Sequence, residues 1–446
     1  MLLVTVEERQ EAGMVRNAMI CLVLLVLGAC QVGIGLAPPP NLYRTGLNYP
    51  AEQVHPSLRT VEPPIFFVTD RAPEAGSYGS ARSESMAFGR ATVRFGKNLD
   101  WSELLNRTRA DSDKNISSLW VPEVEEIVRF NGTPLAYERV AGELRHVPRV
   151  RAFYDAQAAA FQATIAEQIR TTGNDRLLVY IHGFNNAFED GLTTVANLWH
   201  FAGRGSVPIA FTWPAGNGAG PLGYFRDRDA GTFSVHHTKE FLRMLSEMPE
   251  VAQIDIVAHS RGTDVATTAL RELIIEARGS GQHPKLVLKT GTFIMAAPDL
   301  DVDIVRQRLQ AERFSEAFEQ INLYINPNDG ALRLSAYLTR STRLGALRDE
   351  DFLPGELELL RKEALVHFIR VEDVRGGFGH AYFRENPAVL SDVVLALRTR
   401  AFPGGTLRPL EQETEGGVWV LHSNYPLERL PDLSVIEERA LIRDAR

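Results

Sequence analysis

The stretch that decides the fold is Ile254-Asp255-Ile256-Val257-Ala258-His259-Ser260-Arg261-Gly262. Its apolar beginning is typical of a buried strand, and a helix-like stretch over residues 263–278 follows at once. A strand, a sharp turn with serine at its tip and a helix are the parts of a nucleophile elbow. The small residues Ala258 and Gly262 let strand and helix approach closely, although alanine stands where a first glycine is usual. The pattern predicts Ser260 as a nucleophile.

A serine nucleophile needs a histidine that takes its proton. With this elbow, the chain order is serine, then acid, then histidine. Three histidines lie far enough downstream, of which His367 falls inside a predicted strand and His422 in the C-terminal tail. His380 lies in a glycine-rich loop directly after the strand, where a base can reach over the sheet edge. We predict His380 as the base, and the alternative is a loop histidine that caps a helix.

The acid that orients the histidine should follow a strand between Ser260 and His380. Residues 321–325 are typical of a buried parallel strand, and Asp329 stands in the turn after it. We therefore predict Asp329 as the acid. Competing carboxylates follow the preceding strand, over residues 292–296: Asp299, Asp301 and Asp303. Asp299 also suits the N-cap of a helix that begins near Val302.

A second glycine turn follows the buried strand 177–181, in the segment His182-Gly183-Phe184-Asn185-Asn186. Glycine lets the backbone turn so that the next N–H points into the site. The predicted oxyanion donors are the backbone N–H groups of Phe184 and Arg261. His182 and Gly183 support this loop, and His259 and Gly262 support the elbow. For Asn185 and Asn186 we favour turn chemistry over substrate contact.

These segments together resemble the alpha/beta hydrolase superfamily and, within it, a bacterial family catalogued as a domain of unknown function. The resemblance covers about residues 60–400 and includes three further segments: Phe67-Val68-Thr69-Asp70-Arg71, Phe211-Thr212-Trp213-Pro214 and Ala297-Pro298-Asp299. It implies a mostly parallel central sheet with helices on both faces and a serine hydrolase mechanism. It implies no particular substrate.

Periodicity favours the same α/β architecture. Strands that begin near six positions alternate with helices, as in a parallel sheet covered on both faces: Leu177, Pro208, Ile254, Thr292, Ile321 and Val366. Residues 65–68 and 91–95 are expected as early antiparallel strands, and residues 153–169 as an amphipathic helix. We expect one domain over 61–400. Insertions near 214–234 and 341–362 either shape the substrate pocket as a cap or are surface excursions, and the extension 401–446 includes a possible edge strand at 418–421.

The N-terminus resembles a lipoprotein signal. Residues 18–27 are apolar, and Leu27-Gly28-Ala29-Cys30 resembles a lipobox, so residues 1–29 are expected to be removed and Cys30 lipidated. The acidic residues before Met14 do not suit a signal, which favours translation from Met14. Residues 30–60 are then a tether, and Gln31 suits sorting to an outer membrane, facing the periplasm. The alternative is an uncleaved anchor helix.

Composition excludes several function classes. The formal net charge of −8 disfavours nucleic-acid binding through a basic surface. With Cys21 and Cys30 as its only cysteines, the chain has no thiol metal site, and no other metal or cofactor motif is present. His236-His237 is interpreted as structural or substrate-lining. The sequence predicts an envelope serine esterase that needs no cofactor and acts on a small-molecule or lipid acyl substrate. Alternatives are a thioesterase, amidase or acyltransferase, or a non-catalytic envelope scaffold.

Overall fold

The computed structural model describes residues 35–44, 49–110, 117–356, 358, 362, 364–372, 379–413, 417–431 and 433. The predicted signal, Met14 and the predicted lipidation site Cys30 lie outside these residues. Within the described part of the chain, no helix has both the length and the apolar character needed to cross a bilayer.

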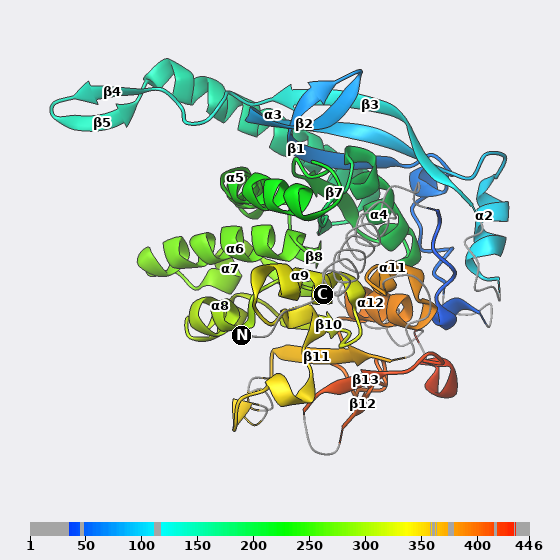
Figure 1. Ribbon diagram of the computed structural model, residues 1–446. Helices are drawn as coiled ribbons and strands as arrows, with labels where there is room; N and C mark the ends of the chain where they lie inside the picture. The colour runs from blue at the N-terminus through cyan, green and yellow to red at the C-terminus, as the bar shows by residue number, and fades with distance from the viewer. Residues whose placement is uncertain are drawn as a thin grey trace, which may run out of the picture.

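A single large sheet organises the described residues (Figure 1). Its strand order is β12-β13-β11-β10-β9-β8-β6-β7-β1-β2-β3. The strands are β1 (Pro64–Glu74), β2 (Ser77–Phe95), β3 (Leu119–Arg129), β6 (Arg176–Ile181), β7 (Val207–Thr212), β8 (Gln253–His259), β9 (Thr290–Ala296), β10 (Gln320–Ile325), β11 (Val366–Val371), β12 (Glu411–Gln412) and β13 (Trp419–Leu421). All six parallel strands expected from periodicity are present.

Neighbouring strands run parallel from β13 to β1, whereas β2, β3 and β12 pair antiparallel with their neighbours. At the centre, Val179 of β6 stands opposite Ile256 of β8 on one side and Ile209 of β7 on the other. The chain therefore leaves β6 for β7 and later returns beside β6 as β8. Ligands in open α/β sheets bind at such a switch point, outside the carboxyl ends of the strands.

Helices cover both faces of the sheet (Figure 1). The α-helices are α2 (Trp101–Thr108), α3 (Pro148–Thr172), α4 (Phe188–Phe201), α5 (Pro221–Ser246), α6 (Gly262–Gly279), α7 (Pro284–Leu288), α8 (Val302–Val305), α9 (Gly330–Thr339), α11 (Tyr382–Glu385) and α12 (Pro387–Thr399). Apolar side chains of α3, α5 and α6 form a core with one face of the sheet. Those of α4 and α12 form a second core with the other face. Because both faces are covered, the central strands are apolar without alternation.

Residues 36–43 differ from the expected tether. Leu36, Leu42 and Tyr43 are fully buried in the core on the α4 side. The Tyr43 hydroxyl donates to the carbonyl of Phe201, and the Leu42 N–H donates to the Ser391 hydroxyl. The prediction of a solvated tether is therefore wrong for this segment, because its apolar residues flank the prolines and cover the sheet.

The two predicted insertions differ in structure. Residues 214–234 hold a short loop and the first half of α5, which contributes Ala230 to the core and contacts the loop after β6 through Tyr224, whose ring centroid lies 5.8 Å from that of Phe184. The described part of 341–362 includes two short 3₁₀ helices, Leu344–Ala346 and Asp349–Asp351. The extension after residue 400 joins the sheet through β13, and β12 rather than β13 forms the edge. A hairpin of β4 (Tyr137–Val140) and β5 (Glu143–His146) projects from the body (Figure 1).

Candidate active site

Ser260 occupies the strained turn between β8 and α6. Its φ of 51° lies in the left-handed region, which costs a non-glycine residue about 1–3 kcal/mol. The turn is held from the β9 side, because the Ser260 N–H donates to Ala296 O at 2.9 Å and the Ser260 carbonyl accepts from Asp299 N at 3.2 Å. The same carbonyl accepts from the Thr263 hydroxyl at 2.6 Å. Neighbouring structure thus maintains the strain that presents the side chain at the sheet edge.

Two glycines allow the elbow and the loop after β6 to touch. A Cβ on Gly262 would collide with the carbonyl oxygen of His182 and lie 2.6 Å from that of Ile181. A Cβ on Gly183 would lie 2.9 Å from the Ser260 Cβ and 3.0 Å from Nδ1 of His259. The close approach explains why glycine is needed at both positions. It also places the loop containing Phe184 directly beside Ser260.

Asp329 and His380 form a hydrogen-bonded pair across two loops. The His380 Nδ1–H donates to Asp329 Oδ2 at 2.7 Å. The other carboxylate oxygen of Asp329 accepts from the N–H groups of Ala331 and Leu332, both at 3.0 Å, which caps α9. The Asp329 side chain is fully buried, so the cap and the imidazole leave little freedom to move. With its Nδ1 occupied in this way, His380 has Nε2 left for chemistry.

The surroundings of His380 favour its charged form. Burial lowers the pKa of the imidazole, but the charge and hydrogen bond of Asp329, with a further contribution from Asp299, outweigh burial and leave the pKa above the usual 6.5. An imidazolium that forms during a reaction is therefore stabilised.

Two hydrogen bonds hold the loop of His380 in place, and the sequence singled out neither of them. The Asn326 side-chain amide donates to Gly379 O at 3.3 Å, and the Asn326 carbonyl accepts from Asp329 N at 3.0 Å. The Tyr382 hydroxyl donates to Tyr324 O at 2.7 Å. Asn326 follows β10 in a turn-forming sequence, and this turn pattern is the only feature of the sequence that points to a structural role for Asn326.

The His380 loop also contacts the elbow through His259. Nε2 of His259 lies 3.3 Å from His380 O, and the two rings lie 4.8 Å apart between centroids. Burial, followed by the charge of His380, lowers the pKa of His259 well below its usual value, so His259 is neutral. Within the described residues, the Ser260 hydroxyl makes no hydrogen bond to His380. Catalytic hydrogen bonds are often loose before substrate binds.

The loop after β6 is held by a buried carboxylate. Asn185 has a φ of 54°, and its N–H donates to Asp227 Oδ2 at 2.8 Å. Asp227 also accepts from the N–H groups of Gly216 and Asn217, so it connects this loop to the one after β7. Sequence reasoning missed Asp227, because nothing in its local pattern distinguishes it from a surface acid of α5. Turn chemistry at Asn185 agrees with the favoured interpretation.

The predicted oxyanion donors flank Ser260. The backbone N–H groups of Phe184 and Arg261 have no protein acceptor among the described residues. Arg261 directly follows Ser260, and Gly183, the residue before Phe184, packs against it. Two free donors beside the same side chain are the arrangement that can stabilise a developing oxyanion.

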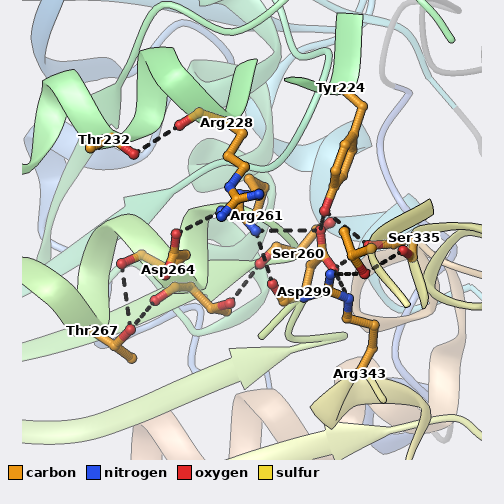
Figure 2. Close-up of polar contacts among 12 residues, drawn as sticks. Tyr224, Arg228, Thr232, Ser260, Arg261, Asp264, Thr267, Asp299, Ser335 and Arg343 are labelled. Atoms are coloured by element: carbon orange, nitrogen blue, oxygen red, sulfur yellow. Dashed lines mark hydrogen bonds and ion pairs between the residues drawn. The ribbon is translucent and has the colours of Figure 1, made fainter. Parts of the chain in front are cut away.

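Asp299 stands beside the elbow in a network of its own, shown in Figure 2. It accepts from the hydroxyls of Tyr224 at 2.9 Å and Ser335 at 2.7 Å, and it lies 3.4 Å from Nε of Arg343. The Arg261 guanidinium donates to Asp299 O at 3.3 Å. Asp299 thus joins α5, α9 and the elbow, while Asp329 contacts the imidazole.

The other competing carboxylates have local partners. Asp301 caps α8 by accepting from the N–H groups of Asp303 and Ile304, which contradicts the alternative role of Asp299 as this N-cap. Asp303 pairs with Arg306.

The remaining singled-out histidines lie in structural positions. The Nδ1–H of His237, on α5, donates to Asp70 Oδ2 at 3.0 Å, and Nε2 of the same ring lies 3.0 Å from the Thr133 hydroxyl. His367 is buried in β11, and burial lowers its pKa to about 3. His422 pairs with Glu372 near the C-terminal end. Within the described ranges, no cluster of acidic, histidine or cysteine side chains fits a metal ion.

A comparison with known families agrees with this architecture. Residues 157–398 match the model of a family described as "Alpha/beta hydrolase of unknown function (DUF900)". The match includes the loop after β6, the elbow, Asp329 and His380, and it begins after β1 to β3. No curated protein matches the chain.

Proposed function

Because the chain belongs to this family of alpha/beta hydrolases of unknown function, we propose that it is a serine hydrolase that cleaves an ester-type acyl bond through an acyl-enzyme. The observation that carries the proposal is the hydrogen bond between His380 and the buried Asp329, in a loop that contacts the strained elbow of Ser260. Strain maintained at a serine beside an oriented histidine has no evident structural purpose.

In the first half of the proposed reaction, the Ser260 oxygen attacks the substrate carbonyl while Nε2 of His380 takes the hydroxyl proton. Asp329 holds the imidazole in the correct tautomer and stabilises its charged form. The N–H groups of Phe184 and Arg261 bind the oxyanion of the tetrahedral intermediate. Collapse of the intermediate breaks the ester bond, and His380 returns the proton to the leaving alcohol.

In the second half, water attacks the acyl-enzyme. His380 takes a proton from the water as the new bond to the acyl carbon forms, and the same two N–H groups bind the second oxyanion. Collapse releases the carboxylic acid and returns the proton to Ser260. An ester is the leading substrate class by analogy with the common use of this fold. Thioesters, amides and transfer to another acceptor use the same residues.

The test is covalent labelling of the protein without residues 1–30 by a fluorophosphonate probe. We expect one adduct on Ser260, located by peptide mass spectrometry, and none in Ser260→Ala or His380→Ala. Ser234→Ala is the matched control, because Ser234 is an equally buried serine whose hydroxyl donates to Ala230 O within α5. A folded protein without labelling, or with an adduct elsewhere, would contradict the proposal and favour a binding scaffold.

Labelling alone leaves the substrate class open, so matched acyl substrates are the second step. We expect p-nitrophenyl esters to turn over faster than the corresponding thioesters and anilides. Faster thioester or anilide cleavage would reassign the protein as a thioesterase or amidase. Product formation that depends on an added alcohol or amine would reassign it as an acyltransferase.

We also propose that the protein is lipid-anchored through Cys30 and faces the periplasm from the outer membrane. The support is the sequence alone, an apolar stretch that ends in Leu27-Gly28-Ala29-Cys30 followed by Gln31. Cells given an alkynyl fatty acid should label the wild type but not Cys30→Ala. Changing Met14 should abolish expression if translation begins there. Cys30→Ala protein that stays lipid-labelled would refute the anchor, and an unprocessed, membrane-bound wild type would favour the anchor helix.

A further inference from the structure

Arg71, at the end of the segment Phe67-Val68-Thr69-Asp70-Arg71, is a buried cation that the proposed reaction leaves unexplained. Its side chain is 1% exposed and forms no ion pair with a carboxylate of the described residues. Nη1 donates to Gly79 O at 3.0 Å and to Ala215 O at 2.9 Å. Nη2 donates to Asn186 O at 2.8 Å and lies 3.3 Å from Nε2 of His182. The charges of Asp70 and Asp227 offset part of the cost of burial, but neither carboxylate bonds the guanidinium directly, which calls for a specific reason.

The contact with Arg71 fixes the tautomer of His182. Burial, followed by the charge of Arg71, lowers the pKa of His182 to about 3, so this imidazole is neutral. A guanidinium can only donate, so Nε2 of His182 accepts from Arg71 and the ring proton sits on Nδ1. Nδ1 lies 2.9 Å from the carbonyl oxygen of Gly183 and donates to it. Arg71 therefore donates to His182, and His182 in turn donates to the carbonyl oxygen of Gly183.

The end of this chain is the peptide that carries the proposed oxyanion donor. The carbonyl of Gly183 and the N–H of Phe184 belong to one planar trans peptide, so holding the oxygen sets the direction of the N–H. A hydrogen bond to the carbonyl also polarises the peptide and strengthens its N–H as a donor. Arg71 holds the far side of the same loop through the carbonyl of Asn186.

We propose that Arg71 and His182 are positioning residues that orient and polarise the Phe184 N–H for the oxyanion. The inference rests on the proposed function, and it assigns a role to β1, which lies before the matched residues 157–398. Besides extending the sheet, β1 thus supports the loop that carries the proposed oxyanion donor. The neighbouring Asp70 fastens β1 to α5 through His237 at 3.0 Å.

The test compares second-order fluorophosphonate labelling rates of four variants. Arg71→Lys keeps the positive charge but loses the several N–H donors of the guanidinium. His182→Phe keeps a ring that can stack on Trp213, whose ring centroid lies 5.1 Å away, but loses both ring nitrogens. We expect each to label about 10²-fold more slowly, the lower range for losing an oxyanion donor. The double variant should be no slower than the slower single variant, because both act through one peptide.

Arg204→Lys is the matched control. Arg204 is also 1% exposed, its Nε donates to a histidine nitrogen, and its Nη1 donates to the carbonyls of Leu58 and Thr60. It follows α4, at the opposite end of that helix from the oxyanion loop. We expect a comparable loss of melting temperature with labelling within twofold of wild type. Equal slowing in Arg204→Lys, or wild-type labelling in Arg71→Lys, would overturn the proposal, as would multiplying effects in the double variant.

A second measurement does not depend on activity. Amide hydrogen exchange of the peptide covering residues 182–187 should speed up in Arg71→Lys and in His182→Phe but not in Arg204→Lys. Unchanged exchange in both site variants would refute the positioning role even if Ser260 proves unreactive. Unlabelled wild type with the expected exchange pattern would instead contradict the proposed function and leave Arg71 as the support of this loop.

Discussion

Replacing Asp329 by asparagine isolates what the acid contributes. Asparagine caps helices about as well as aspartate, so the bonds to Ala331 and Leu332 survive on its amide oxygen. The amide NH₂ then faces His380 where a carboxylate oxygen now accepts at 2.7 Å. Two donors cannot hydrogen-bond to each other, so the imidazole proton moves from Nδ1 to Nε2. Nε2 can then no longer accept the proton of the Ser260 hydroxyl.

From this change of tautomer we expect labelling of Ser260 to slow by about 10⁴-fold, the loss measured for the equivalent change in a serine protease triad. That factor corresponds to about 5 kcal/mol in the barrier. The assay is the second-order rate of fluorophosphonate labelling at fixed pH. Asp301→Asn is the control, because Asp301 caps α8 through two N–H groups without touching a histidine. Labelling of Asp329→Asn within tenfold of wild type, or equal loss in Asp301→Asn, would refute the reasoning.

The pH profile gives the same prediction a second readout. The base must be neutral, so the wild-type rate should rise with pH through the raised pKa of His380, with a midpoint above 6.5. In Asp329→Asn burial is opposed only by the smaller contribution of Asp299, and the midpoint of the rate profile should fall below that of the wild type. For stability, a raised pKa stabilises the fold below the unfolded value of about 6.5, and this advantage disappears as pH rises through the folded pKa. The difference in melting temperature between wild type and variant should therefore narrow above neutral pH.

Three further predictions concern the fold around the site. Ser260→Gly should abolish labelling yet raise stability by about 1 kcal/mol in thermal melts, because glycine relieves the positive φ; a lower melting temperature would contradict the strain. Gly262→Ala should lower stability by about 3 kcal/mol or prevent folding, since its Cβ meets two backbone carbonyls that cannot yield, and soluble protein with a wild-type melt would refute this contact. Leu42→Ala should lower stability in urea unfolding by about 2–5 kcal/mol, because its side chain is fully buried; an unchanged midpoint would restore the tether interpretation.

The order of strands and helices was predictable because it depends on local pattern. Each central strand is a short apolar run bounded by turn residues, and a run of this kind is recognisable without knowing its neighbours. The elbow was predictable for the same reason, since a strand, a serine between small residues and a helix are contiguous. The N-terminal segment was misjudged, because a proline run is typical of a linker and only the sheet shows that Leu36 and Leu42 cover it.

By itself, then, the sequence determined the α/β class, the position of Ser260 in its turn, and a short set of candidate acids and bases. Only the tertiary structure decided that Asp329 rather than Asp299 contacts His380, which is 51 residues away along the chain. It alone brought Arg71 to His182 across 111 residues, and Asp227 to the loop at Asn185. Local propensity acts over a few residues, whereas these contacts exist because parallel strands distant in sequence end at one edge of the sheet.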